Sequence, residues 1–306
     1  MTTLTVFTPT YNRAYCLNVL HDSLVRQTNQ DFVWLIVDDG STDHTSELVN
    51  SWLLNSSISI RYVQQENQGM HGAHNSAFEN IHTELNVCID SDDYMPDDAV
   101  EKIISFWREK GSEDVSGFIA LDSYFNGDII GNMLPENLGK ATLFDLYYKH
   151  GVWGDKKLVY RTAVIKDYPY PLFEGENYVG LAYKWFWLDT HFELLILNEV
   201  LCCVEYLSDG STRNMFRQYR KNPKGFAFYR LELMKLPFAG LKFKYRQAIH
   251  YTSSSLFSKN GRMLAESPEK LLTILALLPG ILLHLFILYK TKNLNRKGYA
   301  AWKSSG

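Results

Sequence analysis

The chain has 306 residues, 46% of them hydrophobic and 14% aromatic, which is enough to bury one substantial core with a smaller appended region. Its four cysteines form no CxxC pair, which argues against a disulfide framework or a zinc knuckle and favours a reducing, cytoplasmic setting. The formal net charge of −3 is unevenly distributed, because residues 201–306 contain 18 Lys and Arg but only 5 Asp and Glu. A basic region of this kind suits an anionic surface, either nucleic acid or membrane.

The first 110 residues predict strands that alternate with helices. The N-terminus has no basic or apolar leader, so a secretory signal is not expected, and it enters a strand directly. The expected strands are residues 4–10, 58–63 and 86–90, with a further strand that opens the stretch 32–43 and runs into a turn, and the expected helices are residues 14–27, 45–54, 73–80 and one after Pro96. This alternation is typical of βαβ units in a parallel sheet.

Polar turns follow three of these strands. In a parallel sheet the ligand crevice lies beyond the carboxyl ends of the strands. The segments 8–13, 38–43 and 90–93 each stand at such an end, so we expect them to converge on one crevice. Residues 115–200 are mixed, with expected strands at 116–125 and 157–165.

The last hundred residues are basic and predict helices. Residues 271–289 are almost wholly apolar and reach the lower end of the about 17–25 residues that a membrane-spanning helix needs. Pro279 and Gly280 stand at the midpoint, and basic residues lie on both sides, which favours a kinked or re-entrant helix at the cytoplasmic face of the membrane. A single span and a buried core helix are the alternatives.

The stretch VCIDSDDYMPDD (87–98) contains five aspartates, and its two halves have different explanations. Asp90 and Asp92 point to the same side of an extended chain, and two carboxylates are suitable ligands for Mg²⁺ or Mn²⁺. Asp97 and Asp98 follow Pro96, where acidic side chains favour the start of a helix.

Four segments together resemble the family 2 glycosyltransferases. They are TPTYNR (8–13), VDDGSTD (37–43), NQGMHGAHN (67–75) and DSDD (90–93), in this order. WGDKKLVYR (153–161), FEGEN (173–177) and YLSDGSTRN (206–214) are similar to a bacterial subgroup that builds surface polysaccharides. The resemblance implies an α/β fold, with a GT-A (Rossmann-like, mainly parallel sheet) domain over residues 1–205. Its nucleotide-sugar half would cover about 1–110 and its acceptor half about 111–205, followed by a basic, helical, membrane-associated region over 206–306.

The resemblance also implies roles for the first two segments. Thr8 and Tyr11 would line the nucleotide base and ribose, with Arg13 nearby. Asp39 would accept a hydrogen bond from the uracil N3–H, and Asp38 would support that loop.

The third and fourth segments would hold the rest of the donor. Asn67, Gly69 and Asn75 would form the wall between nucleotide and sugar. Asp90 would contact ribose or sugar hydroxyls. Asp92, with Asp90, would bind the divalent cation that bridges the two phosphates.

The sequence departs from the family in the acceptor-side motif. Relatives often carry an Asp after the motif's Glu, where it serves as the base, but here that position is Asn177. Glu176 is therefore the candidate base, with Glu174 as the second candidate. A basic residue is common where Met70 stands, and an Arg or Leu is commoner where His74 stands, so the resemblance does not carry over the contacts of this loop to phosphate.

We therefore expect an inverting, metal-dependent glycosyltransferase at the cytoplasmic face of the cell membrane. Its partners would be a nucleotide sugar, most simply a UDP-sugar, a lipid-linked saccharide acceptor and an anionic membrane surface, but no nucleic acid. A teichoic-acid or protein-glycan glycosyltransferase is an alternative, and so is a non-catalytic module that binds sugar nucleotides or membranes. A nicotinamide dehydrogenase is disfavoured because no GxGxxG follows the first strand.

Overall fold

The computed structural model describes the backbone of residues 2–205 and 215–304 and the side chains through residue 292, apart from the same internal gap. The chain divides into two compact units. The first comprises Met1–Tyr170 and Lys184–Leu207, and the second comprises Pro171–Tyr183 and Ser208–Gly306. The main division thus falls two residues after the expected boundary at 205, but residues 171–183 belong to the second unit rather than to the acceptor half of the first.

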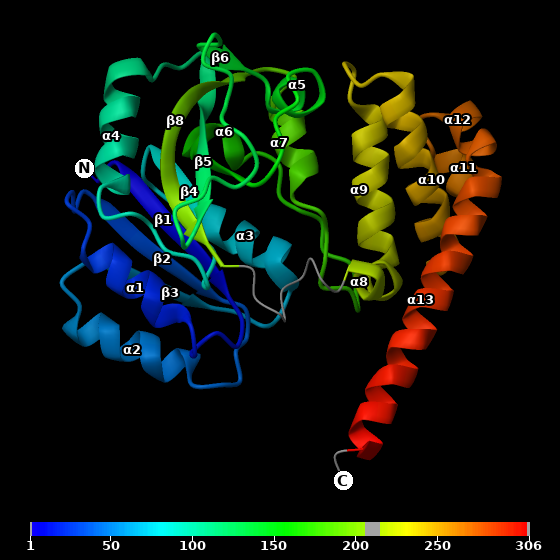
Figure 1. The fold of residues 1–306 in the computed structure, drawn as a ribbon, viewed down its shortest axis with the longest axis horizontal. Coiled ribbons are helices and arrows are strands. Elements are labelled where there is room, and N and C mark those ends of the chain that lie inside the picture. Colours follow the sequence, from blue (N-terminus) through cyan, green and yellow to red (C-terminus); the bar gives the residue numbers. More distant parts are fainter. Residues whose placement is uncertain (1, 206–214, 305–306) are drawn as a thin grey trace. The chain divides into compact units, whose positions relative to one another are not determined.

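The first unit contains one sheet of eight strands in the part of the chain that is described (Figure 1). The strands are β1 (Leu4–Thr10), β2 (Phe32–Asp38), β3 (Ile60–Gln64), β4 (Leu85–Cys88), β5 (Val115–Tyr124), β6 (Lys140–Ala141), β7 (Lys156–Arg161) and β8 (Glu193–Val204). Their order is β3-β2-β1-β4-β7-β5-β8-β6. The first four strands pair in parallel, as expected. β7 runs antiparallel to both β4 and β5, so the sheet is mixed beyond β4.

Helices cover both faces of the parallel half of the sheet. These helices are α1 (Leu17–Val25), α2 (Thr45–Asn55), α3 (Gly69–Asn80) and α4 (Ala99–Lys110). The later helices of this unit are α5 (Leu143–Tyr148), α6 (Thr162–Ile165) and α7 (Ala182–Leu188). α1, α2 and α4 share one hydrophobic core with Leu4 and Val6 of β1. Successive side chains of a strand point to opposite faces, so Phe7 lies on the other face, where its ring is 5.5 Å from that of Phe78 in α3.

The strand expected at 157–165 is shorter than predicted. It ends at Arg161, and Thr162–Ile165 forms α6 instead. The acidic stretch divides as expected, because α4 begins at Ala99 with Asp98 as its N-cap residue. Asp98 also forms an ion pair with Lys102, one turn further along α4.

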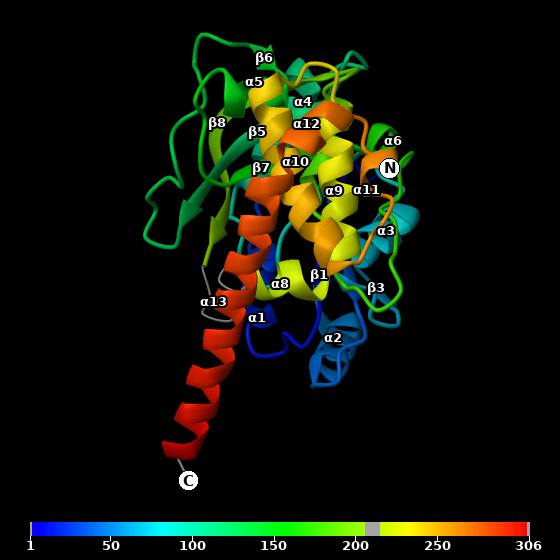
Figure 2. The ribbon, with the colours of Figure 1, turned by 90° about the vertical axis from the view of Figure 1, so that its right-hand side faces the viewer.

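The second unit is helical (Figure 2). Its helices are α8 (Met215–Lys221), α9 (Pro223–Lys235), α10 (Leu241–Phe257), α11 (Met263–Glu266), α12 (Lys270–Leu275) and α13 (Leu277–Ser304). α9, α12 and α13 all pack against α10. Its small core includes Met234, Ala248, Tyr251 and Ala276.

The apolar segment 271–289 is broken, but not at the expected point. α12 ends at Leu275 and α13 begins at Leu277, so the break lies at Ala276. Pro279 occupies the first turn of α13, where a missing N–H leaves no helical hydrogen bond unmade. A Cβ on Gly280 would lie 2.5 Å from Cβ of Thr252, so this glycine lets α13 approach α10 closely. Among the residues whose structure is described, no helix has the length and apolar character needed to cross a membrane.

Candidate functional site

The turns after β1 and β2 are locked together by Asn12. Its Oδ1 accepts hydrogen bonds from the backbone N–H of Thr42 at 2.7 Å and of Asp43 at 3.3 Å. Its own N–H donates to Oγ of Ser41 at 2.8 Å. Asn12 has a φ of 54°, a left-handed conformation that asparagine tolerates better than most residues. Because β4 is the other neighbour of β1, all three expected turns lie at one edge of the sheet.

Asp38 supports the second turn from inside. It is fully buried, and its carboxylate accepts hydrogen bonds from the Ser41 N–H at 2.8 Å and from the Tyr62 hydroxyl at 2.6 Å. Burial, followed by the hydrogen bond to Asp38, raises the pKa of Tyr62 above its usual value. Asp38 therefore holds the shape of the turn.

Asp39 fixes the start of α3. One carboxylate oxygen accepts from the Gln68 N–H and from Nε2 of Gln65, and the other accepts from the Gly69 N–H, each at 2.8 Å. Burial raises the pKa of Asp39, and these hydrogen bonds oppose that effect. Asn67 completes the connection, because its Nδ2 donates to the Asp39 carbonyl at 2.9 Å.

The three residues expected around the nucleotide base do not share one environment. Tyr11 is exposed and Arg13 is half-buried, so both are accessible from the turn after β1. Thr8 is fully buried, and its hydroxyl accepts a hydrogen bond from the indole N–H of Trp34 at 3.0 Å. The structure therefore places Thr8 in the core beneath α1 and α2, where it cannot line the base as expected.

Asn75 clamps a distant loop rather than presenting its side chain freely. Its Oδ1 accepts from the Tyr170 N–H at 2.7 Å, and its Nδ2 donates to the Tyr170 carbonyl at 2.8 Å. Both ends of the amide are thus engaged. Asn75 thus holds residue 170 against α3.

The acidic turn after β4 presents its aspartates at different depths. Asp90 is exposed, Asp92 is half-buried, and Asp93 is buried. Asp93 accepts a hydrogen bond from the Glu205 N–H at 3.3 Å. Burial, followed by the charge of Asp90, raises the pKa of Asp93 to about 8. The inward aspartate thus belongs to the protein interior, and the outward pair Asp90 and Asp92 faces accessible space.

A lysine from β7 lies behind this turn. Nζ of Lys157 is 3.5 Å from the Cys88 carbonyl and 3.8 Å from Oδ1 of Asp122 on β5. Burial alone would lower the pKa of Lys157, but Asp122, Asp93 and Asp90 together raise it. Burial raises the pKa of Asp122 to about 6, against the opposing effect of Lys157. Lys157 therefore places a buried positive charge close to these aspartates.

The exposed pair fits a divalent cation that shares its ligands with a substrate. Asp90 and Asp92 offer hard carboxylate oxygens, and Mg²⁺ commonly takes only one or two of these from protein and the rest from phosphate and water. Among the described residues, no group of three or more His, Cys, Asp or Glu side chains is arranged to hold a metal. A cation at this turn would thus depend on a phosphate-bearing ligand to complete its shell.

The two candidate bases both lie in the second unit. Glu176 is buried, and its two carboxylate oxygens accept hydrogen bonds from the backbone N–H groups of Lys224 at 2.9 Å and Gly225 at 2.8 Å. These N–H groups are in the first turn of α9, so Glu176 caps that helix. Glu174 is exposed, and Asn177 donates its backbone N–H to Oδ1 of Asn222. Glu176 therefore has a structural task that its sequence position did not predict.

Three buried basic side chains line the inner side of α3. His71 has no hydrogen-bond partner on either nitrogen in the described structure, and Nζ of Lys184 has none either. The Lys184 ammonium lies 4.3 Å from the ring centroid of Phe78 and 5.1 Å from that of Tyr170. Burial lowers the pKa of Lys184 to about 7, that of His71 to about 4 and that of His74 to about 3.

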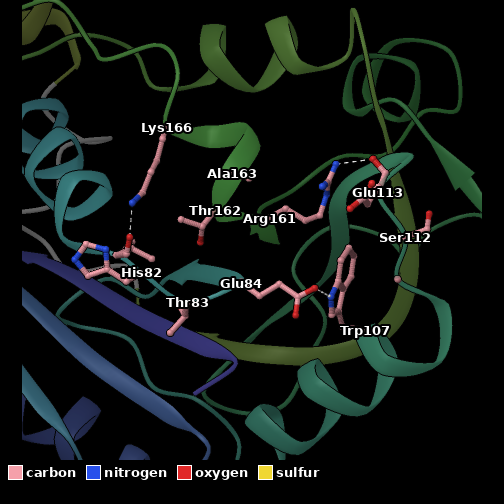
Figure 3. Close-up of a pocket in the computed structure, with 12 residues that line it drawn as sticks. His82, Thr83, Glu84, Trp107, Ser112, Glu113, Arg161, Thr162, Ala163 and Lys166 are labelled. Atoms are coloured by element: carbon pink, nitrogen blue, oxygen red, sulfur yellow. Dashed lines mark hydrogen bonds between the residues drawn. The ribbon is translucent and has the colours of Figure 1, made fainter. Parts of the chain in front are cut away.

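A separate surface cavity of about 570 Å³ lies at the opposite edge of the sheet, next to residues that precede β4 (Figure 3). Three of its side chains donate hydrogen bonds within the protein. Arg161 donates to the Glu113 carbonyl at 2.6 Å, and Lys166 donates to the Ile81 carbonyl. The Trp107 indole donates to Glu84 at 2.6 Å. The cavity therefore lies away from the turns after β1, β2 and β4.

Sequence reasoning gave no role to Asn12, Asp122 and Lys157, and it placed Asp93 in the acidic turn without predicting its burial. Asn12 had a detectable signal, because an asparagine just after a strand suits a left-handed turn. The contact of Lys157 with Asp122 had none, because it depends on β7 lying between β4 and β5. The segment 206–214, which carried part of the resemblance, lies outside the described residues.

Comparisons with known proteins agree with this architecture. Residues 5–168 match the family model described as Glycosyl transferase family 2. Glycosyltransferase GlyA of Streptococcus pneumoniae serotype 4 is 28% identical over 151 residues, which are 48% of this chain and 22% of GlyA. Poly(ribitol-phosphate) beta-N-acetylglucosaminyltransferase TarS of Staphylococcus aureus is 25% identical over 169 residues, which are 55% of this chain and 29% of TarS. The chain thus spans less than a third of the length of either relative.

Solved structures share the fold at low sequence identity. Residues 1–349 of S. aureus TarS in complex with UDP-GlcNAc match with a TM-score of 0.62 and 18% identity, over 90% of this chain and 79% of that one. The mannosyltransferase PcManGT of Pyrobaculum calidifontis, in complex with GDP-Man and Mn²⁺, matches with a TM-score of 0.53 and 15% identity, over 92% and 86% of the two chains. Both likenesses establish the α/β architecture of the chain.

Proposed function

Because the chain belongs to glycosyl transferase family 2, we propose that it transfers a sugar from a UDP-sugar to a surface-glycan acceptor, with inversion at the sugar carbon. One observation carries this proposal most directly. The turn held by Asn12 and the acidic turn of Asp90 and Asp92 follow adjacent parallel strands, and therefore present polar groups at one edge of the sheet. Such an edge is where an α/β sheet binds nucleotides.

In this proposal the donor lies across the three turns. Tyr11 and Arg13 contact the base and ribose, and Asp39 accepts the uracil N3–H in addition to fixing α3. Asn67 and Gly69 hold the loop that separates nucleotide from sugar. The TarS and PcManGT structures, which contain UDP-GlcNAc and GDP-Man, support a nucleotide-sugar donor.

Asp92, together with Asp90, would hold Mg²⁺ or Mn²⁺ in this site. A divalent cation there would neutralise the charge that develops on the leaving diphosphate. The PcManGT complex, which contains Mn²⁺, supports this choice of cofactor. Lys157, behind the same turn, limits the mutual repulsion of the aspartates before a donor binds.

The chemical step requires a base. The acceptor hydroxyl attacks C1 of the sugar, the bond from C1 to the diphosphate oxygen breaks, and the hydroxyl proton passes to a carboxylate. Glu176 and Glu174 remain the two candidates. The hydrogen bonds from α9 occupy Glu176, which favours the exposed Glu174 for direct contact with an acceptor.

The acceptor we propose is a lipid-linked or growing surface polysaccharide, reached at the cytoplasmic face of the membrane. A teichoic-acid acceptor is the second candidate. TarS favours it, and so does the teichoic acid poly(glycerol phosphate) polymerase of Staphylococcus epidermidis, which is 32% identical over 121 residues, or 39% of this chain and 16% of that protein. A protein glycan is a further alternative acceptor, and a binding role without catalysis would follow if neither glutamate served as a base.

The decisive experiment compares UDP, GDP and dTDP by thermal shift and calorimetry, with and without Mn²⁺. We expect UDP with Mn²⁺ to give the largest stabilisation, because binding to the folded state raises the melting temperature. Asp92→Ala should abolish the Mn²⁺-dependent part. Asp97→Ala is the matched control. This exposed aspartate lies in the same acidic stretch, just before α4, but forms an ion pair with Arg26.

Equal stabilisation by all three nucleotides in wild type would contradict the choice of a UDP-sugar. Unchanged Mn²⁺ dependence in Asp92→Ala would contradict the assignment of the metal site. Transfer is then measured with radiolabelled UDP-sugars and membrane-extracted or teichoic-acid acceptors, which separates the two acceptor classes.

A further inference from the structure

One face of α13 is apolar and exposed, and its Phe286 ring also lies 5.7 Å from the ring of Phe216 in α8. This face consists of Leu278, Ile281, Leu282, Leu285, Phe286 and Tyr289, which we call the α13 stripe. These side chains are between 41% and 69% exposed. Their spacing of three and four residues places them along one side of the helix. An exposed, contiguous apolar surface of this length is typical of an interaction site.

The opposite face of the same helix is buried against the unit's own core. Ile287 is 1% exposed, and Gly280 lies against Thr252 of α10. The half-buried His284 also faces α10, because its ring centroid is 4.0 Å from that of Phe257. α13 is therefore fixed in place by packing, and the stripe is presented on a supported helix. Leu271, Ile274 and Leu275 of α12 add exposed apolar surface just before it.

The charges around the stripe select the kind of partner. No acidic residue occurs between Lys270 and Lys292, and Lys270, Lys290 and Lys292 are all exposed. The stripe itself offers no polar side chain except the Tyr289 hydroxyl at one end. A protein interface usually carries directional hydrogen bonds. An apolar band with a tyrosine and lysines at its ends instead matches the boundary between acyl chains and anionic headgroups.

We propose that the α13 stripe lies in the plane of an anionic lipid bilayer, with its side chains inserted among the acyl chains and the flanking lysines at the headgroups. This proposal differs from a re-entrant or spanning helix, because the buried face of α13 remains attached to α10. The biological role of this membrane binding rests on the proposed function, because the enzyme would reach a lipid-linked acceptor at the membrane surface. The binding itself depends only on the second unit.

The test is flotation of the full-length protein with vesicles of neutral phosphatidylcholine and with vesicles that contain about one-third phosphatidylglycerol. We expect wild type to bind the anionic vesicles, and the double variant Leu278→Glu/Leu285→Glu to bind them at least tenfold more weakly. Leu54→Glu is the matched control, because Leu54 is an exposed leucine of α2, 84% exposed and outside the stripe. The triple variant Lys270→Gln/Lys290→Gln/Lys292→Gln should lose the preference for anionic vesicles.

Two results would overturn the proposal. The first is equal binding by wild type and Leu278→Glu/Leu285→Glu, or no binding of wild type to either vesicle. The second is a dimer in light scattering that the same double variant converts to a folded monomer, because a second copy would then cover the stripe. Circular dichroism and the melting temperature verify that each variant is folded.

Nucleotide binding is measured in parallel. If wild type binds UDP but not vesicles, the result contradicts the membrane proposal for the α13 stripe alone. Absence of UDP binding with vesicle binding intact concerns the proposed function alone, so the two failures are distinguishable.

Discussion

Nζ of Lys157 lies 3.8 Å from Oδ1 of Asp122, and this pair joins two antiparallel strands directly behind the acidic turn. Asp122 is 2% exposed, so water screens its charge little. Neither residue is adjacent in sequence to the turn that follows β4. Lys157 thus contacts both β5, through Asp122, and the end of β4, through the Cys88 carbonyl, where we place the donor.

The first prediction concerns this ion pair. Lys157→Met should lower the free energy of unfolding by about 3–5 kcal/mol, because it leaves buried carboxylates without their cation. Lys157→Arg should retain most of the stability, and Lys157→Met/Asp122→Asn should recover part of the loss. Urea unfolding of the single and double variants gives the coupling energy. Additive effects would mean that the two side chains do not interact.

The second prediction concerns the Asn12 lock. Asn12→Ala removes the hydrogen bonds to the turn after β2 and also forces alanine into a left-handed conformation. We expect a loss of about 2–3 kcal/mol in the free energy of unfolding and a weaker thermal shift with UDP. Asn12→Gly removes only the hydrogen bonds, so it should cost about 1 kcal/mol less. Equal losses in the two variants would show that backbone conformation contributes nothing at this position.

The third prediction separates the two glutamates. Glu176→Gln should lower the free energy of unfolding by about 1–2 kcal/mol, because an amide cannot accept both N–H groups at the start of α9. Glu174→Gln should leave the melting temperature unchanged, since Glu174 is exposed. If Glu174 is the base, its variant binds UDP-sugar normally and loses transfer. Full transfer by Glu174→Gln, with transfer lost in a folded Glu176→Gln, would assign the base to Glu176.

The fourth prediction concerns pH. Burial lowers the pKa of His71 to about 4, so the residue is neutral in the folded protein, whereas the unfolded chain protonates it near its usual value of 6.5. Its contribution to stability is therefore complete above pH 6.5 and is lost as the pH falls towards 4. At pH 5.5 the loss is about 1 kcal/mol.

His71→Leu tests the source of this pH dependence. The variant should show a smaller fall in the free energy of urea unfolding between pH 7.5 and 5.5 than the wild type. The control is His150→Gln, which replaces an exposed histidine and is measured over the same pH range. An identical pH dependence in wild type and His71→Leu would mean that His71 is not held neutral in the fold.

Local sequence patterns were sufficient for the parallel half of the sheet. β1, β2 and β4 follow from apolar runs that end in polar turns, and α4 follows from Pro96 and the aspartates after it. The convergence of the three turns also follows, because parallel strands joined by helices must end at one edge. These features depend on residues close together in the chain.

The sequence did not predict how the later segments pair. β7 inserts antiparallel between β4 and β5, and only this arrangement brings Lys157 to Asp122. Residues 171–183 were expected in the first domain, but Glu176 attaches them to α9 through two backbone N–H groups. Hydrophobic periodicity predicts neither the position of β7 in the sheet nor the packing of residues 171–183, because both depend on contacts with residues far away in the sequence.

The acidic stretch 87–98 and the apolar segment 271–289 show which features follow from the sequence and which depend on the tertiary structure. The sequence by itself determined that Asp90 and Asp92 follow a strand, that Asp98 begins a helix, and that residues 271–289 are apolar. Only the tertiary structure decided that Asp93 turns inward, and that α13 buries Ile287 while Tyr289 stays exposed. The physical reason is that composition sets how much apolar or acidic surface exists, whereas packing against other elements decides which part of that surface meets solvent.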